Sequence, residues 1–398
     1  MSFSSEIVAD FAVIMTIAAI VMILFYKLKQ PLILGYLIAG VIIGPYTPPF
    51  SLITRLDVLG ATADLGVILL LFGIGLEFPL SKFRNMGYKV PIGIAAIEIV
   101  LMFLISYGIG WILSWPFMDS LFLGMALASS STVIIAKALS DLGKLKDTSA
   151  TIMMGTLVAE DLFVVLILAL ITSLTGISLP SHLAWAVGKT FLFIFGVLII
   201  GSLVVPKLID WTASLKHDEI LVLVVLGLCF GLSIMANWLG LSMAIGAFLI
   251  GVLVANARSV GKVILLTSPI KDMFAAVFFV SMGALIDITQ FRVFLVPALI
   301  VTVIMIAGKM AGCGLGTKVF GYDTSTSLKV GLGMGQIGEF AFIVVKIGQD
   351  LNLISPVIFQ IIGVAVAITA FSTPYMIKLS YQIEPTHLSA WIKRLLGH

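Results

Sequence analysis

The stretch TIMMGTLVAEDLFVVLILALITSLT, residues 151–175, decides the fold class, because it is long and apolar enough to cross a lipid bilayer. Two adjacent acids, Glu160 and Asp161, lie part-way along it. A charged side chain at membrane depth costs about 2.5 kcal/mol or more, which marks it as a functional candidate. One basic residue is placed as deeply, Lys309 within residues 291–316. The sequence therefore predicts that acid and base face each other inside the membrane.

The composition of the whole chain agrees with this stretch. Hydrophobic residues make up 60% and charged residues 11%, and the mean hydropathy is +1.20. A soluble domain has an apolar share nearer half and a charged share of about a quarter. We therefore expect an all-α polytopic protein of the cell membrane, whose partner is the lipid bilayer. The net charge of +3 is too small to indicate nucleic acid as a partner.

Thirteen apolar runs are candidates for transmembrane helices of about 20 residues each. They lie at about 5–26, 31–46, 58–78, 90–114, 117–139, 151–175, 183–206, 219–237, 239–257, 270–287, 291–316, 325–347 and 354–378. Lys and Arg favour the cytoplasmic side of a membrane. Eighteen lie on the side of the loops that follow odd-numbered spans and four on the other side, with Lys309 left in the membrane. This count predicts an outside N-terminus and a cytoplasmic C-terminus.

A weak internal repeat relates the two halves of the chain. GYLIAGVIIG from Gly35 resembles GAFLIGVLVA from Gly246, and LLFGIGLEF with Gly75 resembles FFVSMGALID with Gly283, at offsets of 211 and 208 residues. Seven spans separate the copies, and an odd number places them in opposite orientations, as in many secondary transporters. The predicted domain is 1–380, with repeat 1 at about 5–175, a linker helix at about 183–206, and repeat 2 at about 219–378. A short cytoplasmic tail, 381–398, follows.

Two spans carry small and polar residues at corresponding places. The fifth has Ser129, Ser130, Ser131 and Thr132, and the twelfth has Gly333, Gly335, Gln336, Gly338 and Glu339. Such residues can unwind a helix where protein or water satisfies the freed backbone, and half-helix ends then offer partial charges to an ion. The alternative is that they only permit close helix packing. We predict two broken helices.

The adjacent acids point about 100° apart on a helix, so they cannot both face one small site squarely. The sequence alone leaves open which of Glu160 and Asp161 binds an ion. A carboxylate beside a lysine in a low-dielectric cavity can exchange a proton for a monovalent cation, although static buried ion pairs also occur. Asp64 and Glu98 also lie inside spans, but we find no polar neighbour for either and assign them no site.

Neither a cofactor nor an enzyme activity is predicted. Gly333, Gly335 and Gly338 spell the dinucleotide fingerprint G-x-G-x-x-G, but no strand precedes it and no βαβ unit surrounds it. The four histidines lie in loops or the tail, so neither metal-dependent nor Cys-His catalysis has support.

Several motifs together resemble the monovalent cation:proton antiporter-2 family, which includes Kef-type and sodium/proton exchangers. They are PLILGYLIAGVIIGP, LLLFGIGLEF, SSSTVI, HDEILVLVVLGL with LGLSMAIGAFLIGVLVAN, FFVSMGALID and GQIGEFAFIV, and they run in order from about residue 30 to 378. The resemblance implies a thirteen-helix homodimer with crossed discontinuous helices and a core domain that moves against a dimerisation domain. It implies exchange of Na⁺ or K⁺ for H⁺.

The resemblance also assigns roles by position. Asp161 becomes the essential carboxylate that binds the monovalent cation or the proton, Thr132 and the neighbouring serines part of the crossed-helix site, and Lys309 the family's lysine opposite. Where sodium-type relatives have Asp-Asp and Kef-type relatives Gln-Asp, this chain has Glu-Asp, which leaves ion selectivity and stoichiometry open. Rival hypotheses are a K⁺ efflux system controlled by a separate cytoplasmic regulatory subunit, a cation channel and a membrane sensor.

Overall fold

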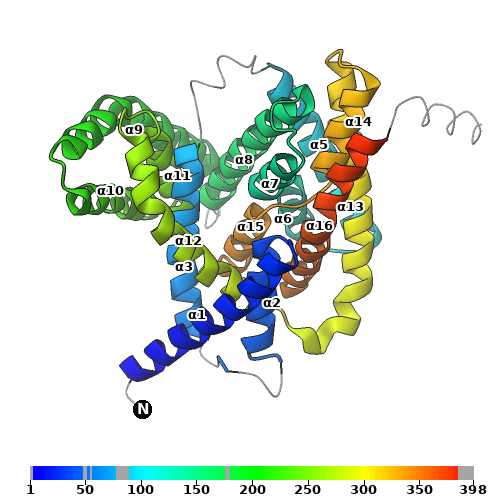
Figure 1. Cartoon of the computed structure of the whole chain (residues 1–398), viewed down its shortest axis with the longest axis horizontal. Helices are drawn as coiled ribbons and strands as arrows, with labels where there is room; N and C mark the ends of the chain where they lie inside the picture. The colour runs from blue at the N-terminus through cyan, green and yellow to red at the C-terminus, as the bar shows by residue number, and fades with distance from the viewer. Residues whose placement is uncertain (1–2, 48–51, 54–55, 78–88, 175–179, 384–398) are drawn as a thin grey trace, which may run out of the picture. The chain divides into compact units, whose positions relative to one another are not determined.

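The computed structural model describes residues 3–47, 52–53, 56–77, 89–174 and 180–383. This part of the chain is helical throughout except for turns and short connections (Figure 1). The tail predicted at 381–398 lies almost entirely outside the described residues.

The helices follow the apolar runs in order. They are α1 (Phe3–Lys27), α2 (Leu32–Ile43), α3 (Leu56–Glu77), α5 (Lys89–Ile112), α6 (Phe117–Ala128), α7 (Thr132–Asp141), α8 (Thr148–Leu174), α9 (Pro180–Ser214), α10 (Asp218–Trp238), α11 (Met243–Val254), α12 (Val260–Ala284), the 3₁₀ helix η1 (Ile288–Gln290), α13 (Phe291–Val319), α14 (Thr324–Met334), α15 (Phe340–Asp350) and α16 (Pro356–Gln382). Each of the thirteen predicted spans coincides with one helix or with a pair separated by a break.

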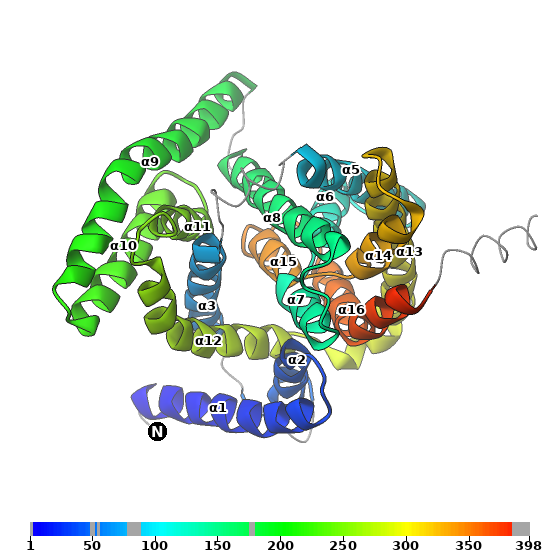
Figure 2. The ribbon, with the colours of Figure 1, turned by 45° about the horizontal axis from the view of Figure 1, so that its top comes forward.

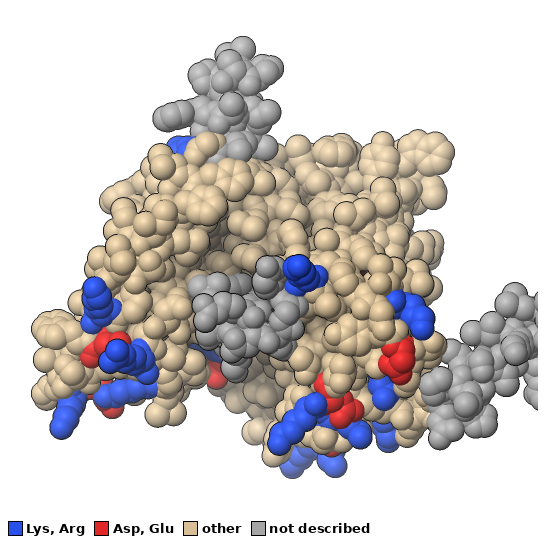
Figure 3. Space-filling view, turned by 90° about the horizontal axis from the view of Figure 1, so that it is seen from above, with Lys and Arg blue, Asp and Glu red and all other residues tan. Residues whose placement is uncertain are grey.

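Nine helical segments of the described residues are long and apolar enough to cross a membrane, and α2, α11 and the middle of α3 are shorter apolar helices. The multi-pass prediction is thus confirmed. Much of the face shown in Figure 3 is uncharged, and Lys and Arg stand there beside Asp and Glu in small groups. That distribution suits contact with lipid, because charged groups avoid the hydrocarbon region. Two helices extend well beyond their predicted spans. Helix α9 has 35 residues, where the sequence indicated a helix over 183–206, and α12 begins at Val260, where the sequence indicated a start at about 270.

The chain divides into two compact units. The first unit comprises Met1–Met22, Tyr36–Arg84 and Val165–Leu285. Glycines bring its helices together, because a side chain on Gly75 of α3 would meet the backbone of Phe248 in α11, and one on Gly40 of α2 would meet that of Val280 in α12. These small residues permit close helix contact without a strong hydrophobic driving force.

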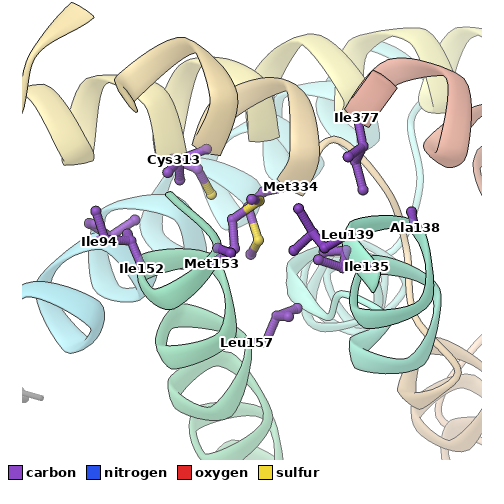
Figure 4. Close-up of a cluster of buried hydrophobic side chains, with 12 residues drawn as sticks. Ile94, Ile135, Ala138, Leu139, Ile152, Met153, Leu157, Cys313, Met334 and Ile377 are labelled. Atoms are coloured by element: carbon purple, nitrogen blue, oxygen red, sulfur yellow. The ribbon is translucent and has the colours of Figure 1, made fainter. Parts of the chain in front are cut away.

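The second unit comprises Ile23–Gly35, Asn85–Val164 and Ile286–His398. Its helices α5, α6, α13, α14 and α16 pack on one another, and α15 packs on α6 and α16 (Figures 1 and 2). Buried side chains from α5, α7, α8, α13, α14 and α16 meet in one apolar cluster (Figure 4). In that figure Met153 and Met334 face each other, and Leu157 lies one turn before the two acids of α8. The cluster therefore packs together the helices that carry the buried polar residues of this unit, among them α8 with Glu160 and α13 with Lys309.

Candidate ion site at two broken helices

Both predicted helix breaks are present in the second unit. Helix α6 ends at Ala128 and α7 begins at Thr132, and the intervening Ser129 and Ser131 have extended backbone. Helix α14 ends at Met334 and α15 begins at Phe340. The alternative that these small residues only permit close packing is therefore wrong for both segments.

The two breaks are hydrogen-bonded to each other. The Gly338 N–H donates to the Ser129 carbonyl oxygen at 2.9 Å. The Ser131 N–H donates to Oε1 of Gln336 at 3.1 Å, and Nε2 of Gln336 donates back to the Ser131 carbonyl oxygen at 3.4 Å. The fully buried Gln336 amide thus takes the place of a backbone peptide group, which satisfies backbone that unwinding would leave unpaired. The two breaks therefore cross, as the family resemblance implied.

Glycine is required at the crossing for a steric reason. A side chain on Gly338 would come within 2.6 Å of the Ser130 carbonyl oxygen, which is backbone and cannot swing away. Gly335, at the end of α14, is less constrained, because the nearest atoms to an added Cβ there belong to side chains, those of Met310 and Met376 at 3.1 Å and that of Ile306 at 3.6 Å. The two predicted glycines therefore differ in role, and only Gly338 sets the distance between the breaks.

The predicted hydroxyl and carboxyl residues lie at the ends of the half-helices. Ser131 is fully buried and its Oγ accepts from the Ile134 N–H at 3.4 Å, which caps α7. Ser130 is also buried, whereas Thr132, the first residue of α7, is partly exposed. Glu339 is partly buried immediately before α15, where the positive end of the helix dipole stabilises a negative charge.

Lys309 on α13 is fully buried and lies against the first break. Its Nζ donates to the Leu127 carbonyl oxygen at the end of α6, at 3.0 Å. A cation is favourable there because the carboxyl end of a helix carries partial negative charge. The same Nζ lies 3.8 Å from Oε2 of Glu160, which is also fully buried. The predicted meeting of acid and base within the membrane domain is therefore present.

Of the two adjacent acids, the structure brings Glu160 to Lys309. Asp161 is 6% exposed, on the same turn of α8. The buried hydroxyl oxygens of Ser129 and Thr156 have no hydrogen-bond partner among the described residues. Thr156 stands four residues before Glu160, on the same face of α8. A buried oxygen whose lone pairs accept no hydrogen bond can instead coordinate a cation.

Glu98 on α5 corrects the sequence analysis, which found no polar neighbour for it. Its Oε1 lies 3.0 Å from Nζ of Lys309, closer than Glu160, and both side chains are fully buried. Two signals could have found it. Glu98 is a mid-span acid like Glu160, and Lys309 lies beside a run of glycines, Gly308, Gly312 and Gly316, spaced for close approach of a second helix.

Thr369 on α16 is a second residue that sequence reasoning missed. Its Oγ1 accepts from the Ile337 N–H at 3.3 Å, so it satisfies backbone inside the second break. No pattern in the sequence distinguishes it from the other hydroxyl residues of α16.

Comparison with known proteins agrees with this geometry. The profile of a family described as sodium/hydrogen exchanger, transmembrane, matches residues 13–379. The chain belongs to that family. The resemblance drawn from the sequence motifs is thereby confirmed, and the crossed breaks lie within the matched exchanger region.

Three similar proteins illustrate the relationship. The Na(+)/H(+)-K(+) antiporter GerN of Bacillus cereus is 32% identical over 368 residues, which cover 92% of this chain and 93% of GerN. K(+) efflux antiporter 5 of Arabidopsis thaliana is 30% identical over 94% of this chain and 66% of its own length. Among solved structures, the sodium proton antiporter MjNhaP1 of Methanocaldococcus jannaschii superposes with a TM-score of 0.74 at 18% identity, covering 94% of this chain and 98% of that one. The last comparison establishes the exchanger fold.

Proposed function

We propose that this protein is a secondary antiporter that exchanges a monovalent cation, Na⁺ or K⁺, for H⁺ by alternating access. The observation that carries the proposal is the buried Glu160, 3.8 Å from the buried Lys309, beside two helix breaks that cross. A carboxylate in such a place can hold either a proton or a cation, because burial disfavours its charge and a bound cation compensates it. The names of GerN and of K(+) efflux antiporter 5 support Na⁺ and K⁺ as candidate ions.

Asp161 and Glu160 are the proposed ion-binding carboxylates, with Ser130, Ser131 and Thr132 at the amino end of α7 as neighbours. In this proposal Lys309 modulates the charge of the site. Gln336, Gly335, Gly338 and Glu339 form the second break, which keeps the site at fixed geometry. Two adjacent acids with one lysine permit either electroneutral or electrogenic exchange.

The proposed domain plan is the one expected from the sequence, with repeats at about 5–175 and 219–378 and a linker helix between them. Helix positions support it: α2 and α11 begin 211 residues apart, at residues 32 and 243, and each has 12 residues. Helices α8 and α16 begin 208 residues apart, at 148 and 356, and each has 27 residues. If α2 corresponds to α11 and α3 to α12, the contact of α2 with α12 through Gly40 corresponds to the contact of α11 with α3 through Gly75. A two-fold repeat requires such matching contacts.

We also propose a homodimer with the N-terminus outside and the C-terminus in the cytoplasm, supported by the family resemblance and by the distribution of Lys and Arg. Native mass spectrometry from detergent checks the dimer, and thiol labelling of a cysteine placed in the tail checks the orientation.

The test of antiport uses purified protein in liposomes with an acid interior. Addition of Na⁺, K⁺ or Li⁺ outside should collapse the pH gradient for at least one of these cations, and Asp161→Asn should abolish the collapse. Asp141→Asn is the matched control, because Asp141 is 60% exposed and forms an ion pair with Lys137 on the surface of α7. It should exchange like the wild type. A wild-type protein that is folded but collapses no gradient would refute antiport.

The same experiment separates the rivals. A channel would pass the cation without proton counterflow, and a sensor would pass neither ion. A K⁺ efflux system with a separate cytoplasmic regulatory subunit would respond to K⁺, the ion in the name of K(+) efflux antiporter 5.

A further inference from the structure

Glu98 is a buried acid that the proposed exchange does not use. It lies on α5, and its side chain is fully buried. A buried carboxylate is costly unless it is paired and hydrogen-bonded. The question is therefore which group compensates the charge of Glu98 and what that pairing does for the site.

The packing of α5 against α13 places Glu98 beside Lys309. Gly308, Gly312 and Gly316 recur every four residues on α13 and line one face of that helix. An added Cβ on Gly312 would lie 3.2 Å from Cα and 3.6 Å from Cβ of Glu98. Because Gly312 has no side chain, α5 approaches α13 closely at that level, and the carboxylate of Glu98 reaches the ammonium group of Lys309.

The distances rank the two acids around Lys309. Nζ of Lys309 is 3.0 Å from Oε1 of Glu98 and donates to the Leu127 carbonyl oxygen at 3.0 Å. Oε2 of Glu160 stands at 3.8 Å, beyond hydrogen-bond length. Lys309 therefore has a near partner in Glu98 and only a Coulombic neighbour in Glu160.

We propose that Glu98 is the counter-ion of Lys309: it holds the ammonium group at the carboxyl end of α6, and it leaves the negative charge of Glu160 to the transported cation. Glu98 is thus a positioning residue that acts through Lys309. This inference rests on the proposed antiport. Without Glu98, the charge of Lys309 would be balanced by the exchanging acids themselves, and the cation would compete with it.

The test compares four variants with the wild type in the liposome assay, with the cation concentration varied to obtain KM. Glu98→Gln should raise KM for the cation about tenfold, which corresponds to about 1.4 kcal/mol of lost binding, with a smaller change in kcat. Glu98→Asp keeps the charge and should stay near the wild type. The double variant Glu98→Gln with Lys309→Gln removes one charge of each sign, so its KM should return toward the wild-type value.

Asp119→Asn is the control for loss of any buried carboxylate. Asp119 is 1% exposed on α6, and its Oδ1 accepts from the N–H of Ser355, the residue immediately before α16, at 2.7 Å. This variant should lower the melting temperature and leave KM unchanged, whereas a merely structural role of Glu98 would make Glu98→Gln behave in the same way.

A KM for Glu98→Gln within twofold of the wild type would overturn the inference, and so would a double variant whose KM is no closer to the wild type than that of Glu98→Gln. If Glu98→Gln does not fold, the double variant decides. A folded double variant with near wild-type KM supports the inference, and one that does not fold or has lost cation dependence overturns it. Failure of the proposed function is seen separately, because the wild type would then collapse no gradient.

Discussion

Gln336 offers a direct test of the crossing, because one side chain satisfies both polar groups of a buried peptide position. Replacement by leucine conserves the approximate size of the side chain and removes the bonds to the Ser131 N–H and carbonyl oxygen, 3.1 and 3.4 Å long. Each buried backbone group left unsatisfied costs about 1–3 kcal/mol. The Ser131 carbonyl oxygen also accepts from the Ile135 N–H at 3.3 Å, so the substitution leaves only the Ser131 N–H unsatisfied. The expected loss of unfolding free energy is therefore about 1–3 kcal/mol, and ion exchange should fall with it because the breaks lose their mutual support.

The loss of stability is measured by denaturant titration of the purified protein in micelles, where the midpoint and slope give the free energy of unfolding. Gln382→Leu is the matched control, because Gln382 is the exposed last residue of α16. Such surface substitutions change stability by about 0.5 kcal/mol or less. A Gln336→Leu protein within 1 kcal/mol of the wild type, or one with wild-type exchange, would refute the view that this amide ties the breaks together.

Two further predictions concern the helix ends and helix contacts. Gly338→Ala should lower both the melting temperature and the rate of ion exchange, since its Cβ would meet the backbone of Ser130. Gly316→Ala is the control and should be tolerated, because its Cβ would meet Ile94 at 3.4 Å, an ordinary contact. Equal melting temperatures of the two variants would contradict this prediction. Asp323 caps α14, and hydrogen bonds from the hydroxyl and N–H of Thr326 lower its pKa. The ionised form therefore stabilises the fold fully above the unfolded-state pKa of about 3.9. This contribution disappears as pH falls through the lower folded-state pKa. Asp323→Asn should therefore melt below the wild type at pH 7 and level with it near about pH 3, and a difference that grows toward low pH would contradict the prediction.

Much of the site could be predicted because its signals are local. The serine run before Thr132 and the glycine-rich run before Phe340 break their helices where the sequence indicated, since freed backbone at that depth is tolerated only within protein or a cavity. The cost of charge in a bilayer likewise singled out Glu160, Asp161 and Lys309. A charge within a span marks Glu98 in the same way, but the sequence shows no partner for it and we assigned it no site. In the structure Nζ of Lys309 lies 3.0 Å from its Oε1.

The sequence by itself determined that the chain is a polytopic helical membrane protein, where its spans lie, and which residues are too costly to be buried without purpose. Those properties follow from the length, apolarity and charge of contiguous segments. Only the tertiary structure decided which acid meets Lys309, that Gln336 pairs with Ser131, and that Thr369 supports the second break. The physical reason is that these contacts join residues up to 211 positions apart, 98 and 309 in the extreme case, and depend on how each helix is rotated and how closely glycines let it approach its neighbour.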